Sequence, residues 1–393
     1  MRRVVLPAPN GAPRARPVAV CAPNAFKGTI DAAAAALAIA RGVRDAGWDA
    51  IEVPVADGGD GTLDVLLAWC GSGARVTQHR VTGPIGKPVT ARLGWIGPRR
   101  VVVELAEASG LRRLAPRQLD ALHATSRGTG ELIRIALDAG ATEIIVGVGG
   151  SACTDGGAGL LQALGGCLLE SRGQEIGPGG AGLEDVATID LTAVREAFAR
   201  CSIAVACDIR SPLLGAEGPA RMFAPQKGAS SDDVLRLERA LTHFAVVASG
   251  VGRGDDLSRI PGAGAAGGCG FGLAVAGARL EAGARLVCDM VGLDATLGAA
   301  TVAITGEGRL DSQTPTGKAP AEVAERSHRL GIPCIAISGS IDDPLPHLFD
   351  MAISLEAFDN DLDPRRHTRA LLRRAARRAV EQVSWGSGAS ASC

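Results

Sequence analysis

Short apolar runs at the two ends of the chain constrain its fold more than any other feature of the sequence. They cover residues 18–22, 51–55, 301–305, 333–337 and 351–355. Helix-type patterns lie between and after them, at residues 32–46, 62–69, 319–330 and 364–383. An alternation of buried strands with helices predicts a parallel sheet that helices cover on both faces. Because two runs come from the start of the chain and three from its end, the segment between them is predicted to be an insertion.

The middle of the chain has a different pattern. Residues 74–104 alternate apolar and polar side chains with Gly-Pro breaks, which is typical of antiparallel strands. Further along, helices are predicted at residues 130–139 and 158–164, and strands at residues 144–148 and 202–207. This second set of strands and helices predicts an α/β domain of its own.

The length of the chain also favours two domains, because 393 residues are too many for one ordinary core. We predict an α/β fold with a discontinuous outer domain and a second α/β domain inserted into it. The predicted segments are a disordered leader (1–16), the outer domain (17–72 plus 288–385), the inserted domain (73–287) and a flexible tail (386–393).

Composition and charge exclude several classes of protein. The chain has 41 lysines and arginines against 42 aspartates and glutamates, so its net charge of −1 provides no field for nucleic acid or an anionic membrane. The ten cysteines form no CxxC pair, which predicts free thiols in a reducing compartment. No apolar run is long enough to span a bilayer. We predict a cytoplasmic protein, a monomer or a small homo-oligomer, that acts on a small molecule.

The loops that follow the predicted outer strands are rich in glycine and charged residues. Their sequences are PNAFKGT (23–29), ADGGDGT (56–62), GEGRLDSQTPTGK (306–318) and SGSIDD (338–343). Ligands of open α/β sheets bind beyond the carboxyl ends of the strands, so these loops are predicted to share one edge. Glycine lets backbone N–H groups approach an anion, and carboxylates hold the Mg²⁺ that phosphoryl transfer needs. The alternative is structural, with Asp57 and Thr62 capping a helix.

Three glycine patterns resemble nucleotide-binding motifs. GAGAAG (262–267) matches a dinucleotide fingerprint, but no predicted strand precedes it. PTGKAP (315–320) resembles the end of a P-loop, yet the upstream glycine and the following Ser or Thr are missing, so no Walker-type ATP site is predicted. VGVGGSACTDGGAG (146–159) follows a predicted strand and leads into a predicted helix. This third pattern favours anion or substrate binding, and tight packing is its alternative.

A set of motifs runs in order from about residue 17 to about residue 355: AFKGT, PVADGGDGT, TGPIG, EASGL, TSRGTGELIRIALDAGATEIIVGVGGSACTDGGAGLLQALG, ACDIRSPLLG, FAPQKGA, GAGAAGGCGFG and ITGEGRLDSQTPTGKAP. Their order and coverage resemble the bacterial type-I glycerate kinase family. The resemblance implies ATP-dependent phosphorylation of D-glycerate, with Mg²⁺ as cofactor and 2-phosphoglycerate favoured over 3-phosphoglycerate. It also implies a flavodoxin-like domain with an inserted α/β domain, in agreement with the strand pattern.

The chain departs from the family pattern in three motifs. Asn24 and Ala25 stand where the family usually has Asp and Ser, Thr154 replaces Asn, and Ala224 replaces Gly. If the enzyme is active, neither the missing carboxylate nor the missing hydroxyl is essential. The charged residues of the motifs are retained: Lys27, Asp57, Asp155, Asp208, Lys227, Glu307 and Asp311.

Carboxylates, lysine and arginine are the catalytic groups available to this chain. No GxSxG elbow is present, and the six histidines lie outside the glycine loops. We predict Asp57, Asp311 and Lys27 as catalytic residues, with Asp57 or Asp311 accepting the proton of the attacking hydroxyl. Lys27 or Arg309 is a candidate to hold the carboxylate of the substrate. The predicted substrate-binding residues are Arg309, Ser109 and Lys227.

The remaining predicted sites concern the nucleotide and the metal ion. Backbone N–H groups in the glycine pattern after residue 148 are predicted to hold the phosphates of ATP. The predicted phosphate-binding residues are Gly149, Gly150, Ser151, Asp155 and Gly156. The predicted Mg²⁺ ligands are Asp208 and Glu307.

Two other functions stay open on the sequence alone. A catalytically silent glycerate-binding regulator would keep the fold and lose turnover, and Asn24-Ala25 is its best support. A nicotinamide-dependent dehydrogenase would use the GAGAAG pattern. Turnover of ATP, binding without turnover, and saturable NAD(P)H binding would distinguish the three.

Overall fold

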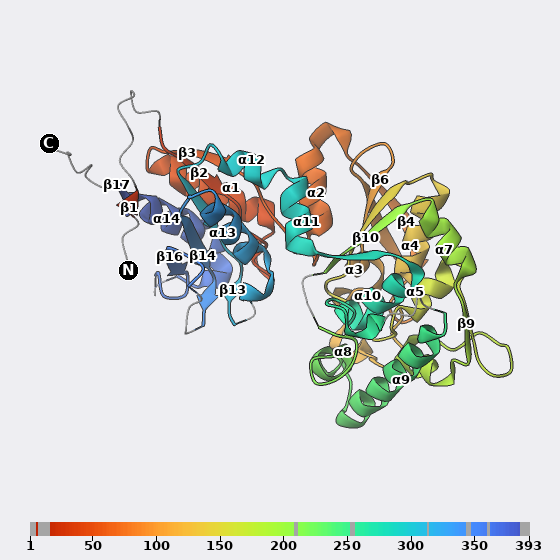
Figure 1. Cartoon of the computed structure of the whole chain (residues 1–393). Coiled ribbons are helices and arrows are strands. Elements are labelled where there is room, and N and C mark those ends of the chain that lie inside the picture. Colours follow the sequence, from red (N-terminus) through yellow and green to blue (C-terminus); the bar gives the residue numbers. More distant parts are fainter. Residues whose placement is uncertain are drawn as a thin grey trace, which may run out of the picture. The chain divides into compact units, whose positions relative to one another are not determined.

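The computed structural model describes residues 5–6, 16–207, 211–251, 256–312, 314–342, 347–359 and 362–385. The chain divides into two compact units, shown in Figure 1. The outer unit comprises Met1–Asp57 and Val287–Cys393, and the inserted unit comprises Gly58–Leu286. The sequence places these junctions near residues 72 and 288. Most of the predicted leader and all of the predicted tail lie outside the described residues.

Five parallel strands form the sheet of the outer unit. Their order is β16-β14-β12-β2-β3, with bounds Met351–Ser354, Cys334–Ser338, Val302–Thr305, Val18–Cys21 and Asp49–Glu52. The five apolar runs of the sequence therefore lie in one parallel sheet, as predicted. Numbered along the chain, the order is 2-1-3-4-5, which is the flavodoxin-like arrangement. The observed bounds of four strands lie within one residue of the predicted runs, whereas β3 starts at Asp49 and ends at Glu52 instead of covering residues 51–55. Strand β3 is an edge strand with alternate residues exposed.

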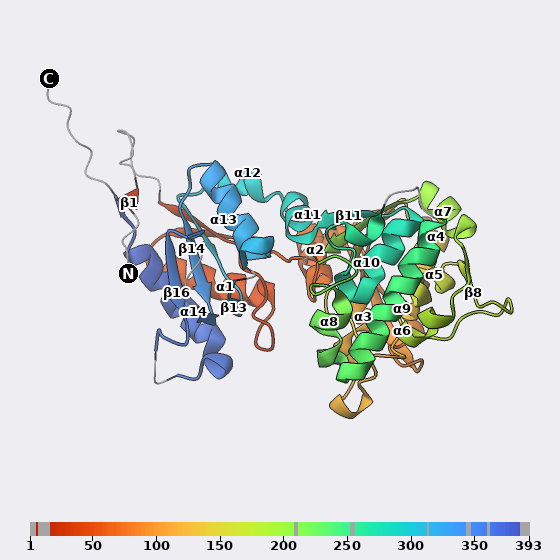
Figure 2. The same cartoon turned by 60° about the horizontal axis from the view of Figure 1, so that its bottom comes forward.

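Helices cover both faces of this sheet. Helices α1 (Ala32–Asp45) and α14 (Pro364–Glu381) lie side by side on one face, where their apolar residues share a core with β2, β12, β14 and β16. Helix α13 (Ala319–Arg329) packs on β12 and β14 from the opposite face (Figure 2). Since the strands are parallel, their carboxyl ends all lie at one edge of the sheet.

The sheet of the inserted unit has six strands in the order β11-β10-β7-β6-β5-β4. Their bounds are Arg279–Ala282, Ser202–Cys207, Glu143–Gly147, Arg100–Glu104, Pro88–Trp95 and Arg75–Thr82. Strands β4, β5 and β6 form the antiparallel meander that the sequence predicts. Strands β6, β7, β10 and β11 are parallel, so their carboxyl ends share one edge.

Helices also cover both faces of the six-stranded sheet. Helices α4 (Arg127–Asp138) and α10 (Ala265–Ala276) pack on one face, and α5 (Ala158–Ala163) lies beside α4. Helix α2 (Thr62–Cys70) packs on the other face, where its Leu63 lies over Gly94 of β5. The bounds predicted from the sequence for α2, α4 and α5 differ from the observed ones by at most three residues at each end.

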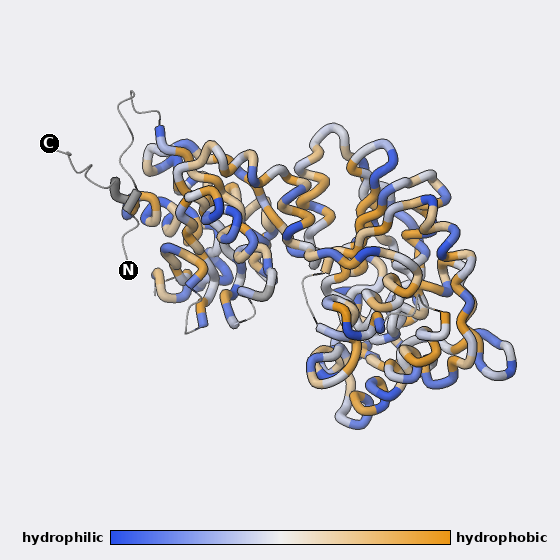
Figure 3. The backbone as a smooth tube through the Cα atoms, in the orientation of Figure 1, coloured by the Kyte–Doolittle hydropathy of each residue, from blue (hydrophilic) through white to orange (hydrophobic). Residues whose placement is uncertain are grey.

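The other elements complete the two units. They are α3 (Leu105–Ser109), α6 (Gly179–Gly182), α7 (Thr192–Ala199), α8 (Pro219–Phe223), α9 (Ser231–Ser249), α11 (Gly283–Met290), α12 (Leu293–Leu297) and the strand pairs β8–β9 (Cys167–Leu169, Thr188–Asp190), β13–β15 (Arg309–Leu310, Ser340–Ile341) and β1–β17 (Val5–Leu6, Ser384–Trp385). Hydrophobic and hydrophilic residues alternate along the backbone of both units (Figure 3). None of the described helices combines the length and apolar composition that a membrane span requires.

Candidate active site

The strand order of the outer sheet reverses between β2 and β12. Open α/β sheets bind their ligands at such a switch point, beyond the carboxyl ends of the strands. The loops that follow the two strands are joined there, because the backbone N–H of Asn24 donates to the carbonyl of Gly306 at 2.8 Å. Gly306 also lies against β14, since a Cβ at this position would be 1.7 Å from the carbonyl oxygen of Ile337. The loops after β2, β12 and β14 therefore converge.

Asp57 and Asn24 form a buried pair at this edge. Each residue is 4% exposed, and Asn24 Nδ2 donates to Asp57 Oδ2 at 3.0 Å. Asn24 Oδ1 accepts a hydrogen bond from the backbone N–H of Ala25 at 2.7 Å, which orients the amide with its nitrogen toward Asp57. Asn24 therefore occupies the place of the family's usual aspartate and holds the Asp57 carboxylate as a hydrogen-bond acceptor.

Glu307, Asp311 and Lys318 form a charged group in the loop after β12. Lys318 Nζ lies 3.2 Å from Asp311 Oδ1 and 4.0 Å from Glu307 Oε1. The pKa of Glu307 is raised to about 7, mainly by burial. The positive charges of Lys318 and Lys27 oppose this rise, whereas the negative charges of Asp57 and Asp311 add to it. These influences place the carboxylates of Asp57, Glu307 and Asp311 in one electrostatic cluster.

The two other cations predicted for this edge differ in their surroundings. Lys27 is exposed in the loop after β2, and its charge acts on Glu307. Arg309 is exposed too, and its guanidinium pairs with Asp342, with Nη2 at 2.8 Å from Oδ2. Lys318 was not predicted as a site residue, because its motif was compared only with the end of a P-loop. Its position in the same loop as Glu307 and Asp311 was the available signal.

The glycine pattern after β7 packs closely on the loop formed by Gly58–Gly61. A Cβ on Gly149 would lie 2.3 Å from the Cα of Gly59, and its N–H donates to the carbonyl of Gly58 at 3.2 Å. Gly150 has a φ of +68°, and a Cβ there would lie 2.5 Å from Asp60 Oδ1. These contacts are those expected of the packing alternative, and phosphate binding by Gly149 and Gly150 stays a prediction.

Lys227 and Ser151 meet inside the inserted unit. Lys227 is 2% exposed, and its Nζ donates to Ser151 Oγ at 2.9 Å and to the Cys153 carbonyl at 2.5 Å. Burial lowers the pKa of this lysine. The ammonium thus fixes the loop between β7 and α5 from within. Ser109 joins the same loop, since its carbonyl accepts from the N–H of Ala152 at 2.9 Å.

Asp155 and Gly156 lie in the interior of this loop. The Asp155 carboxylate is fully buried and accepts hydrogen bonds from the N–H and the Oγ of Ser126, both at 2.8 Å, and from the N–H of Gly157 at 3.1 Å. The N–H of Gly156 donates to the carbonyl of Gly267 at 2.9 Å. Both residues therefore hold α4, α5 and α10 together, and their nucleotide-binding role stays a prediction. Asp208 lies outside the described residues.

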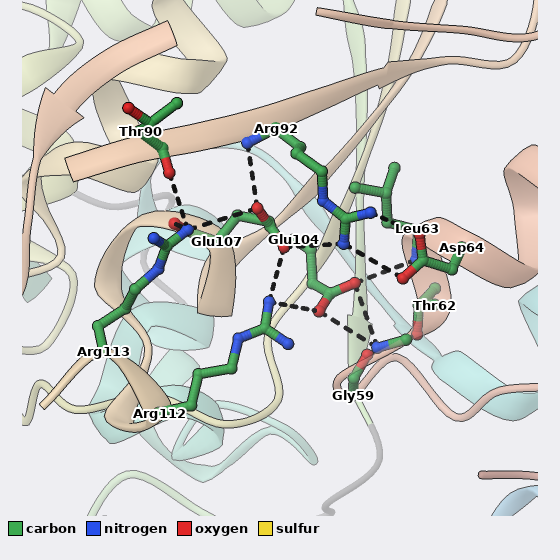
Figure 4. Close-up of polar contacts among 11 residues, drawn as sticks. Gly59, Thr62, Leu63, Asp64, Thr90, Arg92, Glu104, Glu107, Arg112 and Arg113 are labelled. Atoms are coloured by element: carbon green, nitrogen blue, oxygen red, sulfur yellow. Dashed lines mark hydrogen bonds and ion pairs between the residues drawn. The ribbon is translucent and has the colours of Figure 1, made fainter. Parts of the chain in front are cut away.

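Glu104, at the end of β6, supports the first turn of α2 (Figure 4). Its carboxylate accepts hydrogen bonds from the backbone N–H of Gly61 at 3.2 Å and of Leu63 at 3.1 Å. Gly61 is the N-cap residue of α2 and, as a glycine, has no side chain that could cap the helix. The Thr62 hydroxyl donates to the carbonyl of Gly59 instead. The structural alternative, in which Asp57 and Thr62 cap a helix, does not account for the N–H groups of Gly61 and Leu63, because the distant carboxylate of Glu104 accepts their hydrogen bonds.

Glu107 is the centre of an arginine network beside Glu104 (Figure 4). Its carboxylate lies 2.9 Å from Arg92, 2.6 Å from Arg112 and 3.5 Å from Arg113. Burial alone would raise the pKa of Glu107, but hydrogen bonds from Arg92 and the charges of Arg92 and Arg112 lower it. The network fixes β5, α3 and the segment after α3 to one another. Neither Glu104 nor Glu107 was predicted from the sequence, although an acid at the end of a buried strand is a usable signal.

The burial of Glu104 predicts a pH-dependent stability of the inserted unit. The pKa of Glu104 is raised from 4.5 to about 7, mainly by burial. Hydrogen bonds from the N–H groups of Leu63 and Gly61 and the charge of Arg112 oppose this rise, and the charge of Asp60 adds to it. Between pH 4.5 and 7 the folded state keeps a proton on Glu104 that the unfolded state releases. The contribution of this group to the free energy of unfolding is therefore complete below pH 4.5 and is lost as the pH rises to 7. The loss is about 3 kcal/mol.

Glu104→Gln removes this titration. We expect the Tm of the variant, relative to that of the wild type, to rise as the pH goes from 4.5 to 7, as measured by thermal unfolding across this range. Glu143→Gln, at an exposed residue of β7, is the matched control and should show no such trend. A pH-independent difference between Glu104→Gln and the wild type would contradict the prediction.

Comparisons with known proteins identify the family. The profile of the glycerate kinase family matches residues 19–384. The chain belongs to the glycerate kinase family. A glycerate kinase of Bacillus subtilis (strain 168) is 44% identical over 326 residues, which cover 82% of this chain and 85% of the relative. A glycerate 2-kinase of Escherichia coli (strain K12) is 43% identical over 328 residues, with the same coverage of 82% and 85%.

A solved structure supports the same fold for the whole chain. It is a Salmonella typhimurium LT2 protein provisionally named glycerate kinase 2, with a TM-score of 0.79 and 40% identity over 93% of this chain and 98% of that chain. The chain is thus an ATP-dependent kinase, a transferase, on the flavodoxin-like fold with an inserted α/β domain. The dehydrogenase alternative is wrong. The described residues just before GAGAAG form a 3₁₀ turn, Leu257–Arg259, where a dinucleotide site needs a strand.

Proposed function

We propose that this kinase transfers the γ-phosphoryl group of ATP to D-glycerate and forms 2-phosphoglycerate. The relatives named glycerate kinase support glycerate as the acceptor, and the relative named glycerate 2-kinase supports transfer to the 2-hydroxyl. The observation that carries the proposal is the cluster of buried carboxylates at the switch point of the outer sheet. A kinase acting on a hydroxyl needs such groups to take a proton and to hold a cation.

Catalysis of phosphoryl transfer consists mainly of positioning and charge stabilisation. Asp57 is the proposed acceptor of the hydroxyl proton, because its carboxylate is buried at the switch point and is oriented by Asn24. Asp311 is the less favoured acceptor, since Lys318 pairs with it. Lys27 is the proposed partner of the glycerate carboxylate, because it is an exposed cation in the loop after β2 and its charge acts on Glu307 at the switch point.

Mg²⁺ is the proposed cofactor. It prefers oxygen ligands, and the switch point offers the carboxylates of Asp57, Glu307 and Asp311 against the ammonium groups of Lys27 and Lys318. This donor set, with its excess of negative charge, fits a hard divalent cation. Glu307 is the proposed ligand in the outer unit. When bound, the ion would neutralise negative charge on the phosphates.

Analysis of the product tests the proposed function. We expect ADP release that depends on both glycerate and Mg²⁺, measured with a coupled assay. The ³¹P NMR signal of the product should be split into a doublet, because the carbon that bears the 2-hydroxyl carries one hydrogen. A triplet would identify transfer to the 3-hydroxyl, whose carbon carries two hydrogens. Glycerate binding without ADP release would identify the catalytically silent regulator instead.

The regulator is the second candidate because of the substitution at Asn24. An amide at this position keeps a hydrogen bond to Asp57, so the substitution preserves the arrangement of the proposed proton acceptor. The structure of this pair therefore favours the kinase over the regulator.

A further inference from the structure

Lys318 is a charged residue to which the proposed mechanism assigns no task. It is the N-cap residue of α13, and its side chain is 19% exposed. Its Nζ makes ion pairs with Asp311 and Glu307 at 3.2 Å and 4.0 Å. The residue therefore places a positive charge inside the acidic cluster of the switch point.

The acidic cluster alone would repel the substrates of this kinase. Glycerate and ATP are both anions, whereas Asp57, Glu307 and Asp311 bring three carboxylates to one edge of the sheet. Charges that are partly removed from solvent are screened less by salt than exposed ones. A mostly buried ammonium beside the carboxylates is therefore the group that can offset their repulsion most effectively.

The two other cations at this edge are less suited to that task. Lys27 is exposed, so water and salt screen its charge. Arg309 is also exposed, and both its Nε and its Nη2 donate to Asp342, at 3.2 Å and 2.8 Å. Lys318, by contrast, is mostly buried and makes ion pairs with two carboxylates of the cluster.

We propose that Lys318 binds an anionic oxygen of a substrate. That oxygen belongs either to the carboxylate of the acceptor or to a phosphoryl group of the nucleotide. An ammonium has three N–H donors. Within the described part of the chain, Asp311 accepts the hydrogen bond that Lys318 donates, and Glu307 at 4.0 Å is beyond hydrogen-bond distance. Donor capacity thus remains for an incoming anion. The inference rests on the proposed function, which supplies the anions.

Lys318→Met tests this inference because it keeps the apolar stem and removes the charge. We expect kcat/KM to fall roughly 10- to 100-fold, the usual scale for a charge-assisted hydrogen bond. Glycerate and ATP are varied separately. A rise in the KM for glycerate assigns the oxygen to the acceptor, and a rise in the KM for ATP or a fall in kcat assigns it to the nucleotide.

Chemical rescue separates ligand binding from a structural role. We expect ethylammonium in the buffer to restore part of the activity of Lys318→Ala, since it supplies the missing cation in solution. Lys87→Met, at an exposed lysine in the turn between β4 and β5, is the control and should keep wild-type kinetics. Folding of each variant is checked by circular dichroism.

The outcomes distinguish this inference from the proposed function. Wild-type kinetic constants in Lys318→Met, beside an active wild type, would refute the role of Lys318 only. A loss of activity that accompanies a loss of the folded spectrum and resists ethylammonium would also refute it, since the ion pair would then be structural. A wild type without glycerate-dependent ADP release would refute the proposed function itself.

Discussion

Asp57→Asn is expected to lower kcat by about 10²–10⁴-fold, the usual scale for removing a positioned acid–base group. The amide keeps the shape of the side chain and loses its charge and its capacity to take a proton. The Tm should stay within a few degrees of the wild-type value, because an amide oxygen can still accept the hydrogen bond from Asn24. Steady-state kinetics and thermal unfolding measure the two effects.

Asp64→Asn is the matched control for this prediction. Asp64 lies in the first turn of α2, is 53% exposed at its side chain, and pairs with Arg92 at 2.6 Å. Exposed ion pairs contribute little to stability, so both kcat and the Tm should change little. A near-wild-type kcat in Asp57→Asn would remove Asp57 from the catalytic residues and direct attention to Asp311.

Of the Gly→Ala substitutions at the switch point, Gly306→Ala is expected to cause the largest loss of stability. Its Cβ would lie 1.7 Å from the carbonyl oxygen of Ile337, which is backbone and cannot turn aside. Overpacking of this kind costs about 1–3 kcal/mol, which lowers the Tm by roughly 2–12 °C for a unit of this size. Because Glu307 follows directly, the displaced loop should also lower kcat.

Gly298→Ala provides the comparison for Gly306→Ala. Gly298 ends α12 with a φ of −57°, and the atom nearest to an added Cβ is 3.5 Å away, an ordinary contact. Its Tm and kcat should match those of the wild type. Equal behaviour of the two variants would show that β12 and β14 can separate without cost, contrary to the close approach at Gly306.

The outer sheet was predictable because its central strands carry a local signal. All four residues of β12 and all five of β14 are buried, so each strand reads as a continuous apolar run. The edge strand β3 alternates exposed and half-buried residues instead, which is why its predicted start at residue 51 differs from Asp49. Helix α9 was not predicted, although Ser230 and Asp233 form a capping box at its start.

The candidate site was predictable only where a general rule of the fold applies. Asp57, Glu307 and Asp311 were singled out because they follow strands whose carboxyl ends share one edge. Glu104 belongs to no motif that predicts its contacts, since it acts on residues that are distant along the chain. Lys318 closes the loop motif that contains Glu307 and Asp311, but the motif does not show that its side chain turns back toward them.

The sequence by itself determined the strands of the outer sheet, the discontinuity of that sheet and the membership in the kinase family. These properties depend on local periodicity and on motifs in a fixed order, which a chain carries without being folded. The tertiary structure alone decided that Asn24 orients Asp57, that Glu104 caps α2, and that Asp155 is enclosed by N–H and hydroxyl donors. Those contacts join segments brought together only by folding. Carboxylates of the same type therefore have different surroundings, one oriented by an amide at the switch point and others enclosed as structural anchors.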